Sequence, residues 1–375
     1  MFTTRTTVNL IETNSMASFW SRLKRPVFVL APMADVTDAA FRRIIAKYGK
    51  PDVTWTEFVS ADGLCSIGRD KLLPDLSYTE EERPIVAQLF SSNPEKMEEA
   101  ARLVASLGYD GIDINMGCPD KAIERQGCGS AMIKNPAVAA EIIRAAKRGA
   151  PNLPISVKTR LGYNKDELET WLPHVLAEKP AAVTIHARTR KDMSKVPARW
   201  ERVKRAVEIR DEIFGIKDEA DRARVDGDTI PFILGNGDVI DLEDAKKKAA
   251  ETGADGVMIG RAVFGNPWVF SKDPAMARFA PFWESGNPNR APLTREEIET
   301  RLRVGAEHAN LFAEVLAHKG FHIMRKHFKA YCAGFRGARE LRGRLMEAET
   351  AAELTRLIEE FLASPALDEA VAVEQ

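Results

Sequence analysis

The sequence predicts an α/β protein with a (β/α)8 TIM barrel followed by a small all-α helical domain. Eight short runs of β-branched or apolar residues recur up to about residue 260, and helix-like stretches separate them. An alternation of strands and helices is typical of a parallel sheet with crossover helices, and eight such units match a closed barrel in number and length. Beyond Pro281 the pattern changes to helices alone, which predicts a second, helical domain.

The predicted strands are short, and several are nearly continuous in apolar residues, as expected for strands buried on both faces. They are Val27–Ala31, Val53–Phe58, Ile85–Phe90, Gly111–Asn115, Ile155–Thr159, Ala182–His186, Phe232–Asn236 and Val257–Gly260. The sequence therefore places eight parallel strands in one barrel.

Two of the intervening helices have clear start and stop signals. Pro94–Leu107 is closed by Gly108, and Pro136–Arg148 is closed by Gly149, which is the usual preference for proline at the start and glycine past the end. The charge-dense segment Lys217–Asp228 precedes the seventh strand. We expect it to form an exposed loop or a helix extension, without a defined role.

Three parts are predicted along the chain: residues 1–25 as an N-terminal lead-in, residues 26–282 as the barrel and residues 290–375 as the helical domain. The Gly/Pro/Asn-rich stretch ESGNPNRAP marks the boundary between the last two. Residues 1–25 are basic and contain several Ser and Thr, a composition similar to that of an organellar transit peptide. We favour a lead-in that covers the barrel floor.

Composition limits the classes of protein to consider. A chain of 375 residues with 45% apolar and 29% charged residues is typical of a globular protein, and no apolar run is long enough to cross a membrane. The four cysteines lack C-x-x-C or His spacing, which predicts no disulfide framework and no metal site and favours a reducing cytoplasm. The net charge of −1 does not decide for or against a polyanionic partner. The sequence implies no stable protein partner and leaves the oligomeric state open.

Polar residues follow almost every predicted strand, at the end of the barrel where active sites of this fold lie. Charged and amide groups would be costly to bury there without a ligand, so the sequence predicts a pocket for a polar ligand. Gly235-Asn236-Gly237 and Gly260-Arg261 end the last two strands, where many barrels bind phosphate. Either turn alone could be an ordinary tight turn, but the two together with Arg261 favour a phosphorylated cofactor.

Three side chains at strand ends are candidates for chemistry. Lys158 follows a buried run, so we expect its ammonium group in the pocket beside an anionic cofactor ring rather than at the surface. His186 is a cofactor contact or a structural histidine, and its strand-end position favours the first. Cys118 lies in a Gly-Cys-Pro turn next to Asn115, and we prefer it as a proton donor over an inert buried cysteine.

A basic stretch lies within the predicted helices between Lys319 and Arg344, which contains eight Lys or Arg residues and one acid. An apolar stripe at spacings of three and four consists of Phe321, Met324, Phe328, Tyr331 and Phe335. Arg325, Lys326, Lys329 and Arg336 lie largely off that stripe. Such a charge run is often only a solvated face, but it lacks alternating signs, so we predict that it binds a phosphate backbone. His322 and His327 are expected on the same face without a role.

These motifs together resemble the tRNA-dihydrouridine synthase family. The matching stretches are APMADVTDAAFR, QLF, GIDINMGCPDKAIERQGCGSAMIKNP, VKTRLG, IHARTR, GNGDV and GADGVMIGRAVFGNPW, in this order along the barrel. The Asn-x-Gly-Cys-Pro element is the specific one, because the glycine motifs recur in other flavin barrels. The C-terminal helices resemble the RNA-binding helical domain of the family.

The resemblance implies an FMN-dependent oxidoreductase that is reduced by NADPH and reduces the C5–C6 bond of specific uridines in tRNA. Hydride would pass from the flavin to C6, and Cys118 would protonate C5. The implied flavin contacts are Pro32, Met33, Ala34, Gln88, Lys158, His186, Asn236, Gly237, Asp238, Gly260 and Arg261. Asn115 would hold the uracil, and Arg160 and Arg188 would contact substrate or RNA phosphate. The uridine must leave the RNA stack to reach the flavin.

The sequence departs from the family pattern at Lys191–Val196, where many members carry a glutamine and a tyrosine. Two alternatives stay open: an FMN barrel acting on a small molecule, and a non-catalytic RNA-binding protein. The first leaves the Gly-Cys-Pro turn and the basic helices unexplained, and intact Cys118, Lys158 and Arg261 argue against the second. The sequence does not indicate which uridine is modified, or whether NADPH is preferred to NADH.

Overall fold

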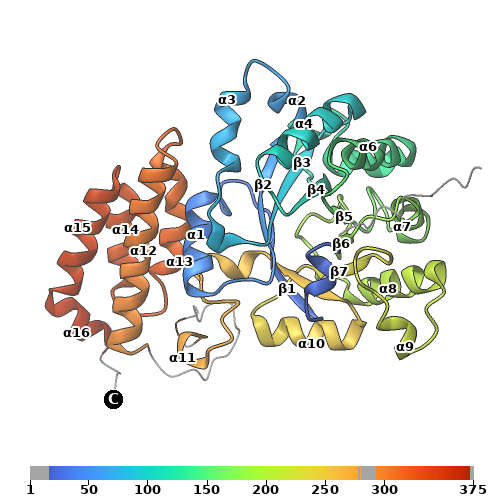
Figure 1. The fold of residues 1–375 in the computed structure, drawn as a ribbon. Coiled ribbons are helices and arrows are strands. Elements are labelled where there is room, and N and C mark those ends of the chain that lie inside the picture. The colour runs from blue at the N-terminus through green and yellow to red at the C-terminus, as the bar shows by residue number, and fades with distance from the viewer. Residues whose placement is uncertain (1–16, 278, 280–292, 372–375) are drawn as a thin grey trace, which may run out of the picture.

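The centre of the molecule is a barrel of eight parallel strands surrounded by helices (Figure 1). This computed structural model describes residues 17–277, 279 and 293–371. The strands are β1 (Val27–Leu30), β2 (Thr54–Ser60), β3 (Ile85–Phe90), β4 (Gly111–Met116), β5 (Ile155–Arg160), β6 (Ala182–His186), β7 (Phe232–Asn236) and β8 (Gly256–Ile259). Each predicted strand is confirmed to within two residues at either end.

The strands pair in chain order around the barrel, and β1 pairs with β8. The remaining gap, between β1 and β2, is bridged by a parallel pairing of Val29 with Val53, and the Leu30 amide donates to the Val53 carbonyl at 3.2 Å. This closure brings the carboxyl ends of all eight strands together at one end of the barrel. The predicted TIM-barrel class is confirmed.

Helices follow the strands and cover the outside of the barrel. The longer ones are α1 (Ala39–Tyr48), α4 (Pro94–Ser106), α6 (Pro136–Gly149), α7 (Leu168–Ala177), α8 (Trp200–Phe214) and α10 (Leu242–Thr252). Short turns of helix fill several loops, namely α2 (Ala61–Leu64), α3 (Arg69–Leu72), α5 (Lys121–Glu124), α9 (Glu219–Arg222) and α11 (Pro274–Ala277). Apolar residues of the longer helices pack on the strands to form the core around the barrel.

Helices α4 and α6 begin in the same way but end differently. Asn93 and Asn135 cap the two N-termini with their side chains, and Gly108 follows α4 with a left-handed φ of 78°. Gly149, which the sequence places past the end of its helix, is instead the last residue of α6. A Cβ atom there would lie 2.2 Å from the Glu98 carbonyl oxygen, so close packing of α6 on α4 requires glycine.

The end of the barrel where the strands begin is filled by aromatic side chains. Trp20 is 1% exposed and lies 6.1 Å from Trp55 and 5.4 Å from Phe232, measured between ring centroids. The segment Lys217–Asp228 forms α9 and loops at the same end, where Gly227 lies against Trp20. Most of its charged residues are exposed, as predicted. The opposite end of the barrel therefore remains for the site.

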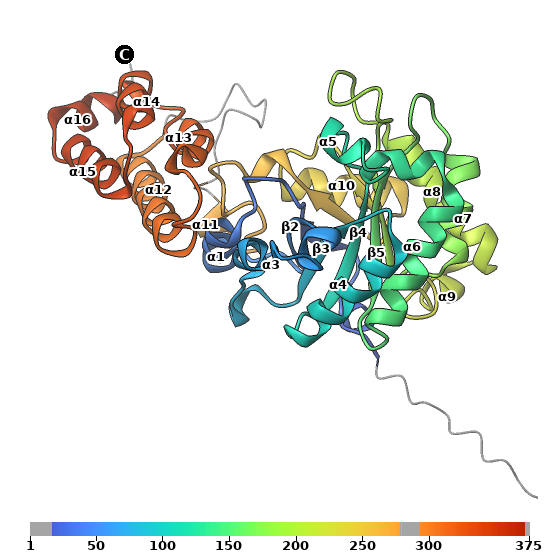
Figure 2. The ribbon, with the colours of Figure 1, turned by 90° about the horizontal axis from the view of Figure 1, so that it is seen from above.

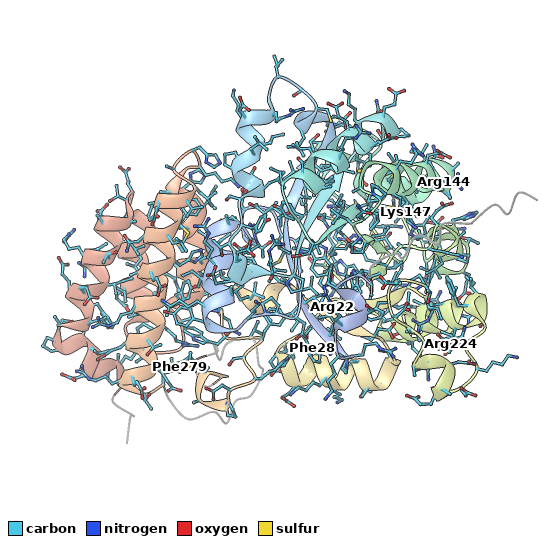
Figure 3. The ribbon with its side chains drawn as sticks, viewed as in Figure 1. Arg22, Phe28, Arg144, Lys147, Arg224 and Phe279 are labelled. Atoms are coloured by element: carbon cyan, nitrogen blue, oxygen red, sulfur yellow. The ribbon has the colours of Figure 1, made fainter. Side chains whose placement is uncertain are left out.

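Ion pairs connect neighbouring helices on the outside of the barrel. Arg144 of α6, labelled in Figure 3, pairs with Glu178 after α7 through two bonds of 2.8 and 2.6 Å. Lys147, one turn further along α6, donates to the carbonyl oxygens of Glu178 and Lys179 and so satisfies the C-terminal end of α7. These contacts fix helices and lie away from the strand ends.

The C-terminal helices form a separate lobe beside the barrel (Figure 2). They are α12 (Arg295–Val315), α13 (Arg325–Tyr331), α14 (Ala338–Glu347), α15 (Ala351–Leu362) and α16 (Pro365–Val371). They bury their own apolar core, and α12 packs on α1 of the barrel. The predicted linker ESGNPNRAP lies outside the described residues, and the proposed domain limits stay predictions. Within the described part of the chain, no helix combines the length and apolarity needed to span a bilayer.

One histidine of the basic stretch lies in the contact between barrel and helices, contrary to the sequence-based expectation. His327 is fully buried, and its ring lies 4.6 Å from that of His308 and 5.1 Å from that of Phe41 of α1. His322 is exposed, as expected. The prediction for His327 was wrong because this part of the helical lobe packs against the barrel. Phe328 is buried in the helical core, and the adjacent His327 ring packs on Phe41 of α1.

Candidate active site

Two adjoining hollows lie at the carboxyl ends of the strands. The larger has a volume of about 270 Å³ and the smaller about 200 Å³, and both are bordered by Pro32, Lys158 and Arg160. The larger hollow is further lined by Ala31, Met33, His186, Arg188, Met193, Ser194, Asn236, Gly237, Asp238, Val239, Gly260 and Arg261. The smaller is further lined by Phe58, Gln88, Asn115, Gly117, Cys118 and Pro119. Two ligands bound in these hollows would therefore meet at the three shared residues.

The structure brings nearly all of the sequence-predicted barrel residues to these hollows. Cys118, Asn115, Arg160, Arg188 and every predicted cofactor contact except Ala34 line one hollow or the other. Ala34 is exposed on the loop after β1, next to the lining residue Met33. The placement follows from the fold, since each of these residues lies within the last three residues of a parallel strand or in the loop after it.

Cys118 follows β4 in a turn held by Asn115. The Asn115 Oδ1 atom accepts from the amides of Gly117 and Cys118 at 3.1 and 2.9 Å, while its Nδ2 donates to Gln88 Oε1 at 3.1 Å. Burial raises the pKa of the Cys118 thiol. The sulfur therefore carries its proton at neutral pH and lies on the wall of the smaller hollow.

Two further contacts hold the carbonyl groups of this turn. The buried Arg160 donates from Nε to the Gly117 oxygen at 2.7 Å, and Ser130 donates from its amide and hydroxyl to the Cys118 oxygen at 2.9 and 3.0 Å. Gly129 has a φ of 59°, and a Cβ atom there would lie 2.6 Å from the same oxygen. The loop after Cys118 thus closes tightly over the turn because of a glycine that no other residue could replace without strain.

The electrostatics of the larger hollow are set by the cationic side chains that line it. Burial, assisted by the nearby Arg160, lowers the pKa of Lys158 to about 8, so the ammonium form still predominates at pH 7. Lys158 Nζ lies 3.4 Å from Asn236 Oδ1. Burial and the surrounding cations lower the pKa of His186 well below its usual value, which keeps its imidazole neutral. The hollow thus presents a positive charge beside a neutral hydrogen-bonding ring.

Asp238 organises the arginines of the larger hollow. Its carboxylate accepts from Arg188 and Arg261, and from the Ala198 amide at 2.8 Å. Burial alone would raise the pKa of Asp238, but the hydrogen bonds from Arg188 and Ala198 outweigh burial and hold the pKa below its usual value. Arg188 is buried and also donates to the Val196 carbonyl at 2.6 Å. Arg261 is exposed and keeps donors for an anion.

Several residues of the site were missed by sequence reasoning. Phe58, Met193 and Ser194 line the hollows, and Met193 belongs to the stretch where the chain departs from the family pattern. Asp113 is fully buried inside the barrel, where it accepts from Gln88 Nε2 at 2.6 Å. A lone charged residue within the apolar run GIDINM was the available signal for Asp113. No sequence signal indicated that Phe58 lines the smaller hollow.

The basic helical stretch separates into two groups. Arg325, Lys329 and Arg336 are exposed and Lys326 is half-buried, and none of the four forms an ion pair with a described carboxylate. Lys319 belongs elsewhere, because it pairs with Glu57 and Asp75 of the barrel. The apolar stripe predicted opposite the basic residues is buried at Met324, Phe328 and Tyr331 and half-buried at Phe321 and Phe335.

No grouping of three or more His, Cys, Asp or Glu side chains able to hold a metal ion occurs among the residues that the structure describes. Barrel topology and a two-part pocket at the strand ends, lined by a thiol and by cationic side chains, define an enzyme of the (β/α)8 class.

The comparisons with known proteins identify the family. Residues 29–370 match the model of the family described as dihydrouridine synthase (Dus), and the chain belongs to this family. It is 40% identical over 346 residues to the probable tRNA-dihydrouridine synthase 2 of Bacillus subtilis, covering 92% of this chain and 96% of the relative. It is 40% identical over 361 residues to the probable tRNA-dihydrouridine synthase of Staphylococcus aureus strain COL, covering 95% and 99%.

Among solved structures, histamine dehydrogenase from Rhizobium sp. 4-9 superposes with a TM-score of 0.48 and 12% identity. The alignment covers 74% of this chain and 48% of that chain. This likeness is too distant to support a functional argument, so the family assignment rests on the sequence comparisons.

Proposed function

We propose that this protein is a tRNA-dihydrouridine synthase that reduces the C5–C6 bond of specific uridines in tRNA, using FMN reduced by NADPH. Family membership and the relatives named above support the activity. The observation that carries the proposal for this chain is the meeting of the two hollows at Lys158 and Arg160, with Cys118 on the wall of the smaller one. A cofactor and a substrate base could thus lie in contact beside a proton donor.

The residues of the larger hollow fit FMN. Ala31, Met33 and Val239 offer apolar surface for a flat ring, and the Gly260 backbone is open, since a Cβ atom there would meet nothing closer than 3.6 Å. Arg261 and the turn at Gly237 line the same hollow, and their proposed role is to hold the phosphate group. When bound and reduced, FMN would supply the hydride for uracil C6. Lys158 would stabilise negative charge on the ring, and neutral His186 would donate or accept a hydrogen bond.

The residues of the smaller hollow fit an extruded uracil. Cys118 holds its proton at neutral pH, as a general acid for C5 requires. Asn115 uses its oxygen on the turn and one amide hydrogen on Gln88, which leaves the second amide hydrogen for a uracil carbonyl. Phe58 and Pro119 provide apolar faces against which a base can stack. Arg160 holds the turn through Gly117 and lines both hollows, so its proposed contact with substrate is compatible with its structural role.

The unpaired basic residues of the helical lobe, among those that the structure describes, support tRNA as the partner. Arg325, Lys326, Lys329 and Arg336 lack ion-pair partners among the described residues, so their charges are available for phosphate groups. Their proposed role is to hold the RNA backbone while the uridine leaves the stack and enters the smaller hollow. Arg188 is buried, bonds to Asp238 and lines the larger hollow, and its proposed role is to contact the substrate or an RNA phosphate group.

An anaerobic reoxidation experiment tests this function. The purified protein is reduced with NADPH, its flavin absorbance is recorded, and unmodified tRNA or free uridine is then added. We expect rapid reoxidation with tRNA and none with free uridine. Reoxidation only by small molecules would instead favour an FMN barrel with a small-molecule substrate, and a protein without flavin would favour a non-catalytic RNA-binding role. Repeating the reduction with NADH measures the preference between the two nicotinamides.

A further inference from the structure

A chain of side-chain hydrogen bonds runs from the Cys118 turn into the barrel interior and ends at Asp113. The amides of Gly117 and Cys118 donate to Asn115 Oδ1, and Asn115 Nδ2 donates to Gln88 Oε1. Gln88 Nε2 in turn donates to Asp113 Oδ2 at 2.6 Å. In each of these hydrogen bonds, the acceptor is the group nearer to Asp113 along the chain.

The strand register explains why these side chains meet. Gln88 of β3 and Asp113 of β4 are paired residues of adjacent strands, and Asp113 is also paired with Ser156 of β5. Paired residues on parallel strands point to the same side, here the barrel interior. Ser156 Oγ donates to the other oxygen of Asp113 at 2.6 Å. Both carboxylate oxygens are thus engaged, in a side chain with no exposed surface.

The chemistry of Asp113 fixes which group donates and which accepts in each hydrogen bond of this chain. A carboxylate only accepts hydrogen bonds, whereas an amide side chain can turn over and exchange its donor and acceptor. With the amide nitrogen of Gln88 directed at Asp113, the Gln88 oxygen is directed at Asn115. The Asn115 amide is then held with its oxygen toward the turn, where two backbone N–H groups require an acceptor.

We propose that Asp113 is a positioning residue that fixes the orientations of Gln88 and Asn115 and thereby the turn that carries Cys118. This inference rests on the proposed role of Cys118 as proton donor. A buried carboxylate is costly unless hydrogen bonds compensate for its lost hydration. The Asp113 carboxylate accepts hydrogen bonds from Ser156 and Gln88, and the second of these residues leads directly to the site.

The test compares Asp113→Leu with Asp113→Asn. Leucine has a similar size but accepts no hydrogen bond, whereas asparagine keeps one oxygen for Gln88 and can direct its amide nitrogen at the Ser156 hydroxyl. The first readout is the rate at which iodoacetamide alkylates Cys118 in the flavin-loaded protein, followed by peptide mass spectrometry. Cys65, Cys128 and Cys332 in the same digest serve as internal references.

We expect Asp113→Leu to speed the alkylation of Cys118 by about threefold or more relative to the reference cysteines, because the turn loses its anchor. The kcat on tRNA should fall by about tenfold or more with an unchanged KM for tRNA, since a small displacement of a reacting group is costly and the RNA-binding residues are untouched. In Asp113→Asn, the alkylation rate and kcat should both stay within about threefold of the wild-type values.

Three outcomes would overturn the inference: wild-type alkylation of Cys118 in Asp113→Leu, faster alkylation without a fall in kcat, or equal damage by leucine and asparagine. If Asp113→Leu shows no cooperative melting, Gln88→Leu cuts the same chain one bond nearer the turn, and the alkylation rate alone is measured. A wild-type protein inactive on tRNA would overturn the proposed function, whereas the alkylation rates would still decide the role of Asp113.

Discussion

Lys319 of the helical lobe lies with its Nζ atom 3.1 Å from Oε2 of Glu57, at the carboxyl end of the barrel. The other oxygen of Glu57 accepts from the amide of Asp35, in the loop after β1 that borders the larger hollow. Lys319 also pairs with Asp75 at 2.8 Å. A single lysine thus connects the helical lobe to the loop that leads into the site.

Loss of this connection should destabilise the protein. The Lys319 side chain is 15% exposed and that of Glu57 8%, so Lys319→Ala would leave two poorly solvated carboxylates without their cation. We expect the free energy of unfolding to fall by about 2–3 kcal/mol. Urea denaturation measures it, and Lys329→Ala, which removes an exposed lysine, should change stability by less than about 0.5 kcal/mol. Equal effects of the two substitutions would contradict the prediction.

The buried histidine pair should make stability fall in mild acid. Burial lowers the pKa of His308 to about 3 and that of His327 well below its usual value. These histidines bind protons near pH 6.5 in the unfolded chain but not in the folded one. Their contribution to the free energy of unfolding is therefore complete above pH 6.5 and is lost as the pH falls below it. Each imidazole should lower the free energy of unfolding by about 2 kcal/mol between pH 7 and pH 5.

The matched variant for this pH effect replaces both His308 and His327 by Phe, which keeps the aromatic contacts with Phe41 and removes the titration. Denaturation at pH 7, 6 and 5 should show a smaller loss of stability in this variant than in the wild type. Other titrating groups cancel in the difference between the two proteins. Parallel curves would show that these histidines do not contribute.

Removal of the Cys118 thiol should separate cofactor binding from turnover. The Cys118→Ala protein should keep its flavin spectrum, because Cys118 lines only the smaller hollow. Its turnover on tRNA should fall by about 10²–10⁴-fold, the usual contribution of a general acid. Cys65→Ala, remote from both hollows, is the control and should turn over normally. Full activity of Cys118→Ala would assign the proton donor to another group.

The RNA-binding proposal predicts a change in salt dependence. Replacement of Arg325, Lys326 and Lys329 by Ala should weaken tRNA binding and reduce the slope of log K against log salt, by up to about 0.7–0.9 for each phosphate that the protein no longer neutralises. The control neutralises Arg295, Arg303 and Arg356, which are engaged by carboxylates of the same lobe. Filter binding at several salt concentrations measures both. An unchanged slope in the first variant would place the RNA elsewhere.

Two glycine-to-alanine substitutions in helices should have opposite signs. In α6, Gly149→Ala should destabilise the protein by more than about 1 kcal/mol, because the new methyl group meets the Glu98 carbonyl. In α14, Gly343→Ala meets nothing within 4 Å and should stabilise by about 0.5–1 kcal/mol through helix propensity. Thermal unfolding of both proteins measures the difference. Destabilisation by both would mean that α14 does not tolerate a side chain at position 343.

The sequence alone determined the barrel and most of its pocket. Strand positions were predictable because each strand is a short apolar run with its own turn signals, and a parallel barrel necessarily gathers the strand ends at one rim. Residues such as Cys118, Lys158 and Arg261 could therefore be placed together from their positions at or after the ends of strands, without knowledge of any contact between them.

Only the tertiary structure decided which polar groups bond to one another. The pairing of Lys319 with Glu57 joins residues 262 positions apart, and position 149 requires glycine because α4 lies against it. His327 is buried by the docking of the helices on α1, and Asp113 becomes the end of a hydrogen-bond chain through the register of three strands. Local patterns specify which face of an element is apolar, whereas partners of a buried polar group depend on elements that are distant in the chain and meet only in the folded protein.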